Sequence, residues 1–143
     1  MSELVSTNWV YKNLYNRKLV ILDCSWHLPS QKRNPLKDYQ DSHIKKSLFF
    51  DIDKIADKKS NLPHMTPNPM FFEKKMQQFG VNSNSIVIVY DTIGIFSSAR
   101  VWWLFKYFGH DKVFVMNGGL QKWKKEKKPT TKTIIIPKKG NFK

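Results

Sequence analysis

Short apolar runs alternate along the chain with longer segments whose apolar residues recur every three or four positions. Runs such as "LVILD" and "SIVIVY" are rich in β-branched residues and predict buried strands. The longer segment "NPMFFEKKMQQFG" predicts a helix, with Asn68 as N-cap, Pro69 in the first turn and Gly80 as the stop. Strands are expected at 19–23, 47–53, 85–90, 112–116 and 130–136, and helices near 7–15, 36–44, 68–79, 97–108 and 118–127.

This alternation predicts an α/β domain with a mostly parallel five-stranded sheet and helices on both faces. In such sheets, ligands bind beyond the carboxyl ends of the strands. Three expected strands end on acidic residues, namely Asp23, the pair Asp51 and Asp53, and Asp91, and His64 lies in the loop that follows Asp53. These groups could share one rim, although aspartates at strand ends also commonly cap turns.

The segment "YDTIGIFSSAR" joins an expected strand to an expected helix through a short loop that contains a glycine. Backbone N–H groups of such a loop converge on one point, and the helix N-terminus adds partial positive charge there. This arrangement favours an anion or a nucleophile. The residue at the start of the loop is Asp91, so a carboxylate already stands where an anion would be held.

Composition indicates a globular chain of 143 residues, of which 41% are hydrophobic. The net charge is +14, but lysines far outnumber arginines, which favours solvated surface charge over a nucleic-acid site. No apolar run has the roughly 20 residues that would span a bilayer, and no secretory signal is visible at the N-terminus. The single cysteine, Cys24, fits a reducing, cytoplasmic location, and no cofactor or metal site is expected.

The order of several segments resembles the N-terminal domain of two-domain rhodanese-type sulfurtransferases, the thiosulfate and 3-mercaptopyruvate sulfurtransferases. These segments are "VILDCSW", "FFDID", "LPHMTP", "ARVWW" and "MNGGLQKW", and the resemblance covers roughly residues 4 to 123. It implies transfer of sulfur from thiosulfate or 3-mercaptopyruvate to an acceptor such as cyanide or a thiol. Each segment alone would be a weak signal.

The resemblance also implies which parts of the reaction this chain would lack. In this family, the second domain carries a catalytic cysteine at the start of the strand-to-helix loop, and the first domain has an aspartate there, which matches Asp91. A carboxylate can accept the N–H bonds of the loop but is a poor sulfur acceptor. Arg100, close to Ser97 in the loop, is expected to offset part of the charge. Cys24 lacks an electropositive setting and is expected to be a small buried side chain.

By the same resemblance, the active site lies between the two domains. Trp26, Asp53 and His64 would then face the catalytic loop of the second domain, with Asp53 orienting His64 as a base. The alternative is that His64 is a loop histidine bonded to backbone. Asp51 is expected to cap a turn.

These inferences lead to an expected domain organisation. Residues 1–129 would form the inactive rhodanese-like domain, and residues 130–143 would supply a last strand and, in "PKKGNFK", the start of an interdomain linker without a core pattern. The expected partners are a C-terminal catalytic domain, in the same or a separate chain, and a small sulfur donor. A stand-alone binding or regulatory module that recruits an acidic partner is the alternative, and nucleic-acid binding is disfavoured.

Overall fold

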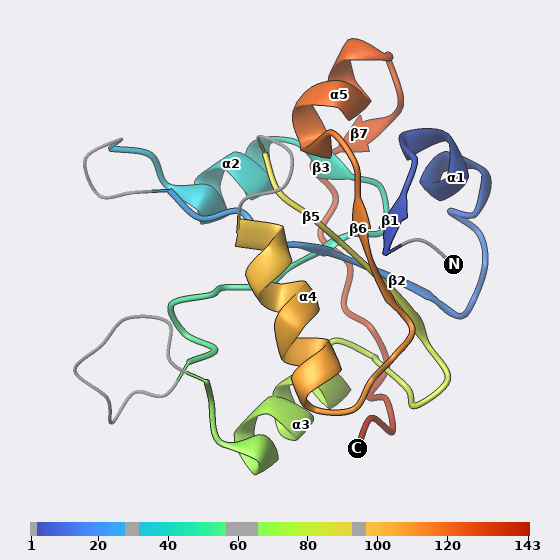
Figure 1. Cartoon of the computed structure of the whole chain (residues 1–143). Coiled ribbons are helices and arrows are strands. Elements are labelled where there is room, and N and C mark those ends of the chain that lie inside the picture. Colours follow the sequence, from blue (N-terminus) through green and yellow to red (C-terminus); the bar gives the residue numbers. More distant parts are fainter. Residues whose placement is uncertain (1–2, 28–31, 57–65, 93–96) are drawn as a thin grey trace.

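The computed structural model of the chain describes residues 3–27, 32–56, 66–92 and 97–143 (Figure 1). Twelve elements lie in these residues. They are β1 (Leu4–Val5), α1 (Thr7–Lys12), β2 (Leu19–Asp23), α2 (Pro35–Asp41), β3 (His43–Ile44), β4 (Leu48–Phe49), α3 (Pro69–Gln78), β5 (Ile86–Tyr90), α4 (Ser97–Tyr107), β6 (Val113–Met116), α5 (Gly119–Lys125) and β7 (Thr130–Thr131).

The main sheet has five parallel strands in the order β1-β6-β5-β2-β4. β2 and β5 form its centre, and their register pairs Leu19 with Ile86 and Asp23 with Tyr90. Because parallel strands point the same way, the residues that follow Asp23 and Tyr90 leave the sheet at the same edge. The expected α/β fold with a parallel five-stranded sheet is therefore confirmed.

Alternate residues of the strands feed two hydrophobic cores, one on each face of the sheet. Val87 and Val89 of β5 join the core that also holds Phe72 of α3, whereas Ile88 joins the core that holds Trp123 of α5. Figure 1 shows α4 lying across the strands of the first face. Helices thus cover both faces, and the period-two pattern of the strands assigns each side chain to a core.

The fifth strand of the sheet differs from the expected one. It is β1, whose backbone bonds β6 through Val115 N to Glu3 O at 3.0 Å and Asn117 N to Val5 O at 2.9 Å. The expected strand over 130–136 is reduced to the two residues of β7, which pair antiparallel with β3 outside the main sheet. Since Ile134 and Ile136 are exposed, this isoleucine run has no sheet face to bury.

The expected helix boundaries are largely confirmed by their caps. Ser6 Oγ accepts Trp9 N at 3.0 Å at the start of α1, and Asn68 Oδ1 accepts Met70 N at 2.9 Å at the start of α3. α1 ends at Lys12 rather than near Tyr15, because Asn13 forms the C-cap and its Nδ2 donates to Trp9 O at 2.7 Å. Within the described ranges, no helix combines the length and apolar character that crossing a bilayer requires.

The C-terminal residues pack on the domain, although "PKKGNFK" shows no core pattern in the sequence. Phe142 is 1% exposed, and its ring lies 5.7 Å from that of Phe72 and 5.9 Å from that of Phe105. Its backbone N donates to Val81 O at 3.0 Å. A Cβ on Gly140 would lie 2.1 Å from the same Val81 oxygen, so only glycine fits this close approach. Whether a linker follows remains a prediction.

The last residue of β2, Asp23, has a buried carboxyl group. The Asp23 carboxylate accepts Ser25 N at 2.9 Å and is 2% exposed. Burial raises its pKa to about 6, against the lowering effect of hydrogen bonds from Ser25 and Tyr90. The Tyr90 hydroxyl in turn lies 3.0 Å from Ser47 Oγ, which ties the end of β2 to the turn before β4.

We expect Phe142→Ala to lower the free energy of unfolding by about 3–5 kcal/mol, because it removes a buried ring from an aromatic cluster. Ile136→Ala, at a side chain that is 94% exposed, should change it by less than about 0.5 kcal/mol. Urea denaturation of both variants measures the difference. Equal stabilities would show that Phe142 does not belong to the core in solution.

The raised pKa of Asp23 predicts a pH-dependent stability. The folded state holds the Asp23 proton more tightly than the unfolded state, so stability from this group is present below pH 4 and is lost as the pH rises to about 6. From pH 4 to pH 7.5, the free energy of unfolding of Asp23→Asn should therefore rise by about 2–3 kcal/mol relative to that of the parent chain. Denaturant titrations of both chains at pH 4 and pH 7.5 measure this. If the free energies of unfolding of variant and parent differ by the same amount at both pH values, the prediction is wrong.

Candidate functional site

The segments after β2 and β5 lie side by side at the carboxyl edge of the sheet. Cys24 N donates to Tyr90 O at 2.7 Å, and Ser25 Oγ lies 2.9 Å from Thr92 Oγ1. These two bonds continue the strand pairing beyond the last residues of β2 and β5. The segments that carry Asp23 and Asp91 are therefore joined at this edge, whereas His64 lies outside the described residues and a rim shared with it stays a prediction.

Asp91 accepts two hydrogen bonds from the first turn of α4. Its Oδ2 lies 2.9 Å from Ser98 N and 2.8 Å from Ser98 Oγ, and the side chain is 2% exposed. A carboxylate at this position satisfies an otherwise unpaired helix N–H and faces the positive end of the helix dipole. Asp91 thus binds the first turn of α4, whereas residues 93–96 lie outside the described residues, so the expectation that it accepts N–H bonds of the loop stays a prediction.

The backbone of the same segment anchors α5. Asp91 O accepts Leu120 N at 2.8 Å, and Thr92 O accepts Gln121 N at 3.1 Å. Gly118 and Gly119 enter α5 with φ of +90° and +64°, a backbone conformation that favours glycine and makes a tight turn here. Residues 91–92 thus join β5, α4 and α5 at one point.

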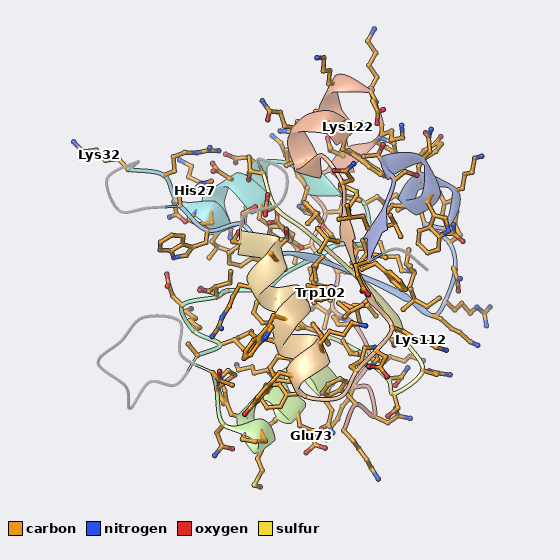
Figure 2. All side chains as sticks on the ribbon, viewed as in Figure 1. His27, Lys32, Glu73, Trp102, Lys112 and Lys122 are labelled. Carbon is orange, nitrogen blue, oxygen red and sulfur yellow. The ribbon has the colours of Figure 1, made fainter. Side chains whose placement is uncertain are left out.

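Ser97 and Arg100 lie on α4 next to this junction. Ser97 Oγ is buried and has no hydrogen-bond partner among the described residues. The Arg100 guanidinium lies 5.2 Å from the centroid of the Trp103 ring, and partial burial lowers its pKa. Its expected role in offsetting the Asp91 charge remains a prediction. Figure 2 shows Trp102 on α4, and its side chain packs against the same core as Phe105.

Trp26 and Asp53 are brought together from different loops. Trp26 Nε1 donates to Asp53 Oδ1 at 3.2 Å. Asp51 caps the turn that carries Asp53, as expected, because its Oδ1 accepts Asp53 N at 3.0 Å and Lys54 N at 3.2 Å. His64 lies outside the described residues, so its pairing with Asp53 stays a prediction.

Cys24 is a buried, inert thiol. The side chain is fully buried, and its Sγ donates to Leu22 O at 3.5 Å. Burial raises its pKa well above the usual value, and the nearby charges of Asp23 and Asp91 raise it further. Burial thus favours the neutral thiol, and the expectation of a small buried side chain is confirmed.

The structure adds His27, which the sequence analysis did not single out. It follows Trp26 and lies beside α2 (Figure 2), with its Nε2 3.5 Å from Asp38 Oδ2, and Arg33 binds the same oxygen at 2.9 Å. The 3.5 Å separation is long for a hydrogen bond, and within residues 3–27, 32–56, 66–92 and 97–143 neither buried ring nitrogen has a hydrogen-bond partner. Burial, and then the Arg33 charge, lower its pKa. In the sequence, the one feature that could have drawn attention to His27 is its position directly after Trp26, an expected site residue.

The arrangement defines what the rim can do. It holds a fixed negative charge at the helix terminus, a buried neutral thiol and an indole–carboxylate pair at its edge. In the part of the chain that the structure describes, no three His, Cys, Asp or Glu side chains come close enough to hold a metal ion. The described residues of the rim can therefore donate and accept hydrogen bonds, and the one thiol among them, Cys24, is fully buried.

Comparison with known proteins agrees with this geometry. Residues 6–126 match the rhodanese-like domain family. The chain is 48% identical over 121 residues to thiosulfate/3-mercaptopyruvate sulfurtransferase 1, mitochondrial, of Arabidopsis thaliana, which covers 85% of this chain and 32% of that protein. It is 37% identical over 123 residues to the 3-mercaptopyruvate sulfurtransferase of Escherichia coli strain K12, with 85% and 44% covered.

A solved structure shows the same fold. The crystal structure of SseA from Escherichia coli, a 3-mercaptopyruvate sulfotransferase, aligns with a TM-score of 0.93 and 33% identity, over 99% of this chain and 55% of that one. The chain thus spans about a third to a half of the length of the curated relatives it matches. The match to the family domain, the identities and the shared fold together show that the chain belongs to the rhodanese family and is homologous to its thiosulfate and 3-mercaptopyruvate sulfurtransferases.

Proposed function

We propose that this chain is the N-terminal, non-catalytic domain of a sulfurtransferase that moves sulfur from thiosulfate or 3-mercaptopyruvate to cyanide or a thiol. The observation that carries the proposal is the pair of hydrogen bonds from Ser98 N and Ser98 Oγ to Asp91 Oδ2. They occupy the helix terminus where, in the catalytic domain of this family, the amides of the loop cradle a persulfide. The position therefore has a resident anion.

The described residues offer no substitute nucleophile. Sulfur transfer through a persulfide needs a thiolate, because a carboxylate oxygen is a poor sulfur acceptor. Cys24 is the only thiol in the sequence, and its burial favours the neutral form. We infer that the catalytic cysteine belongs to a second rhodanese domain, in the same or a separate chain.

In this proposal the chain contributes residues to an interface with that second domain. Trp26 and Asp53 are already joined by a hydrogen bond, and they lie on segments that follow the carboxyl ends of β2 and β4. Side chains at such positions can reach across a domain boundary. His64 is proposed to act with Asp53 as a base, with Asp53 fixing the orientation of the imidazole.

Two further parts of the proposal concern partners and location. The small sulfur donor would bind between the domains, and a cytoplasmic location is proposed from the single reduced cysteine. The stand-alone binding module is not favoured, because the relatives that match this chain are named as sulfurtransferases. Nucleic acid is not proposed as a partner.

The first prediction is that this chain alone does not convert cyanide to thiocyanate with thiosulfate or 3-mercaptopyruvate, because it lacks a reactive thiol. Thiocyanate formation by the purified chain is the measurement, with a two-domain sulfurtransferase as positive control. Sustained turnover that disappears in Cys24→Ser would overturn the proposal and identify Cys24 as the nucleophile.

The second prediction concerns the chain joined to a cysteine-bearing rhodanese domain. His64→Ala should lower kcat/KM with 3-mercaptopyruvate by about 10²–10⁴-fold, as expected for loss of a general acid–base group. Asp53→Asn should lower it less if Asp53 only orients His64, and equally if the tautomer it fixes is essential. Steady-state kinetics measures these effects.

The control for this experiment is Trp26→Phe, which keeps a ring but removes the N–H that binds Asp53. It should have a smaller effect than His64→Ala, and circular dichroism should show that each variant is folded. Full activity of folded His64→Ala would make His64 a structural loop residue and remove it from the site.

A further inference from the structure

A cavity of about 340 Å³ lies away from the rim that carries Asp91. Its walls come from three segments that are distant in sequence: residues 14–15 after α1, residues 45–46 between β3 and β4, and residues 131–135 at and after β7. The first segment precedes β2 and the second precedes β4, so both lie toward the amino ends of these strands. The cavity is therefore separate from the proposed interdomain site at the carboxyl ends.

Apolar side chains form the body of this cavity. Leu14 is buried at its base, and Tyr15 and Ile135 contribute walls that are 82% and 37% exposed. The neighbouring Ile134 and Ile136 are also exposed, at 56% and 94%. Of these side chains, Tyr15 and Ile135 line the cavity itself, and exposed apolar surface in a cavity often marks a place where a ligand removes it from water.

Two lysines line the same cavity in different ways. Lys46 Nζ donates to Leu14 O at 3.2 Å and to Asn16 O at 2.7 Å. Lys46 itself lies in the turn between β3 and β4, with φ of +79°, so these bonds hold that turn against the segment that carries Leu14. Lys45 donates to the Tyr15 hydroxyl at 3.2 Å and lies 5.3 Å from the centroid of that ring. An ammonium group has three N–H donors. Lys45 therefore has donors left for an anionic group at the mouth of an apolar cavity.

We propose that this cavity binds an amphiphilic anion, namely a medium-chain carboxylate. Its head group would accept hydrogen bonds from Lys45 Nζ, and its hydrocarbon chain would lie along Leu14, Tyr15 and Ile135. The volume is at the lower end of the range for small-molecule pockets, which fits a single chain and not a larger ligand. The net charge of +14 attracts anions to this protein in general, and the apolar walls select those with a hydrophobic tail.

The test is titration of the full chain with decanoate below its micelle concentration, followed by backbone amide NMR and by calorimetry. We expect saturable shifts that centre on residues 14–15, 45–46 and 131–135. Decanol, which has the tail without the charge, and butanoate, which has the charge with a short tail, should both bind at least about 10-fold more weakly.

Paired charge variants show whether Lys45 is responsible. Lys45→Gln should weaken decanoate binding about 10-fold, whereas Lys74→Gln, which makes the same change in net charge at an exposed position of α3, should leave it unchanged. Both lysines are exposed, and circular dichroism confirms the fold. The absence of saturable binding, equal losses in the two variants, equal affinity for decanol, or shifts centred elsewhere would each overturn the proposal.

Discussion

The carboxylate of Asp91 is the point on which the arrangement of this domain depends. Its side chain binds the first turn of α4 through Ser98, and its backbone oxygen binds Leu120 at the start of α5. β5, at the centre of the sheet, is thereby linked to one helix on each of its faces. A charge-assisted hydrogen bond in a buried position is stronger than a neutral one, and leaving its donors unpaired would be costly.

In the proposed function, this constraint also explains how a rhodanese domain without a catalytic cysteine would keep its fold. A strand-to-helix loop that holds a persulfide needs a group with negative charge to keep its donors satisfied, and a carboxylate attached to the chain meets that need permanently. The hydrogen-bond donors that bind the carboxylate are then not available to an anion from solution. In that proposal, Asp91 both stabilises the junction and leaves this position without a sulfur nucleophile.

The sequence predicted the parts of the molecule that depend on local signals. Strand β5 and the N-cap Asn68 of α3 each carry a pattern within a few residues of chain. β1 and β7 have only two residues each, too few for a periodic pattern, and they form because distant partners bind them. Phe142 stands alone among lysines and glycine, so no pattern could show that its ring enters the core. His27 became notable only through its burial beside Asp38.

The docking of Phe142 also has a mechanical consequence for anything attached after Lys143. If residues 130–143 were a free coil, the end of the chain would wander over roughly 20 Å. Because Phe142 and Gly140 are bound against α3 and Val81, a following segment would instead start from a nearly fixed point on the surface. A domain tethered there would have a smaller accessible volume. Its effective concentration at the neighbouring surface would therefore be higher, without any new contact.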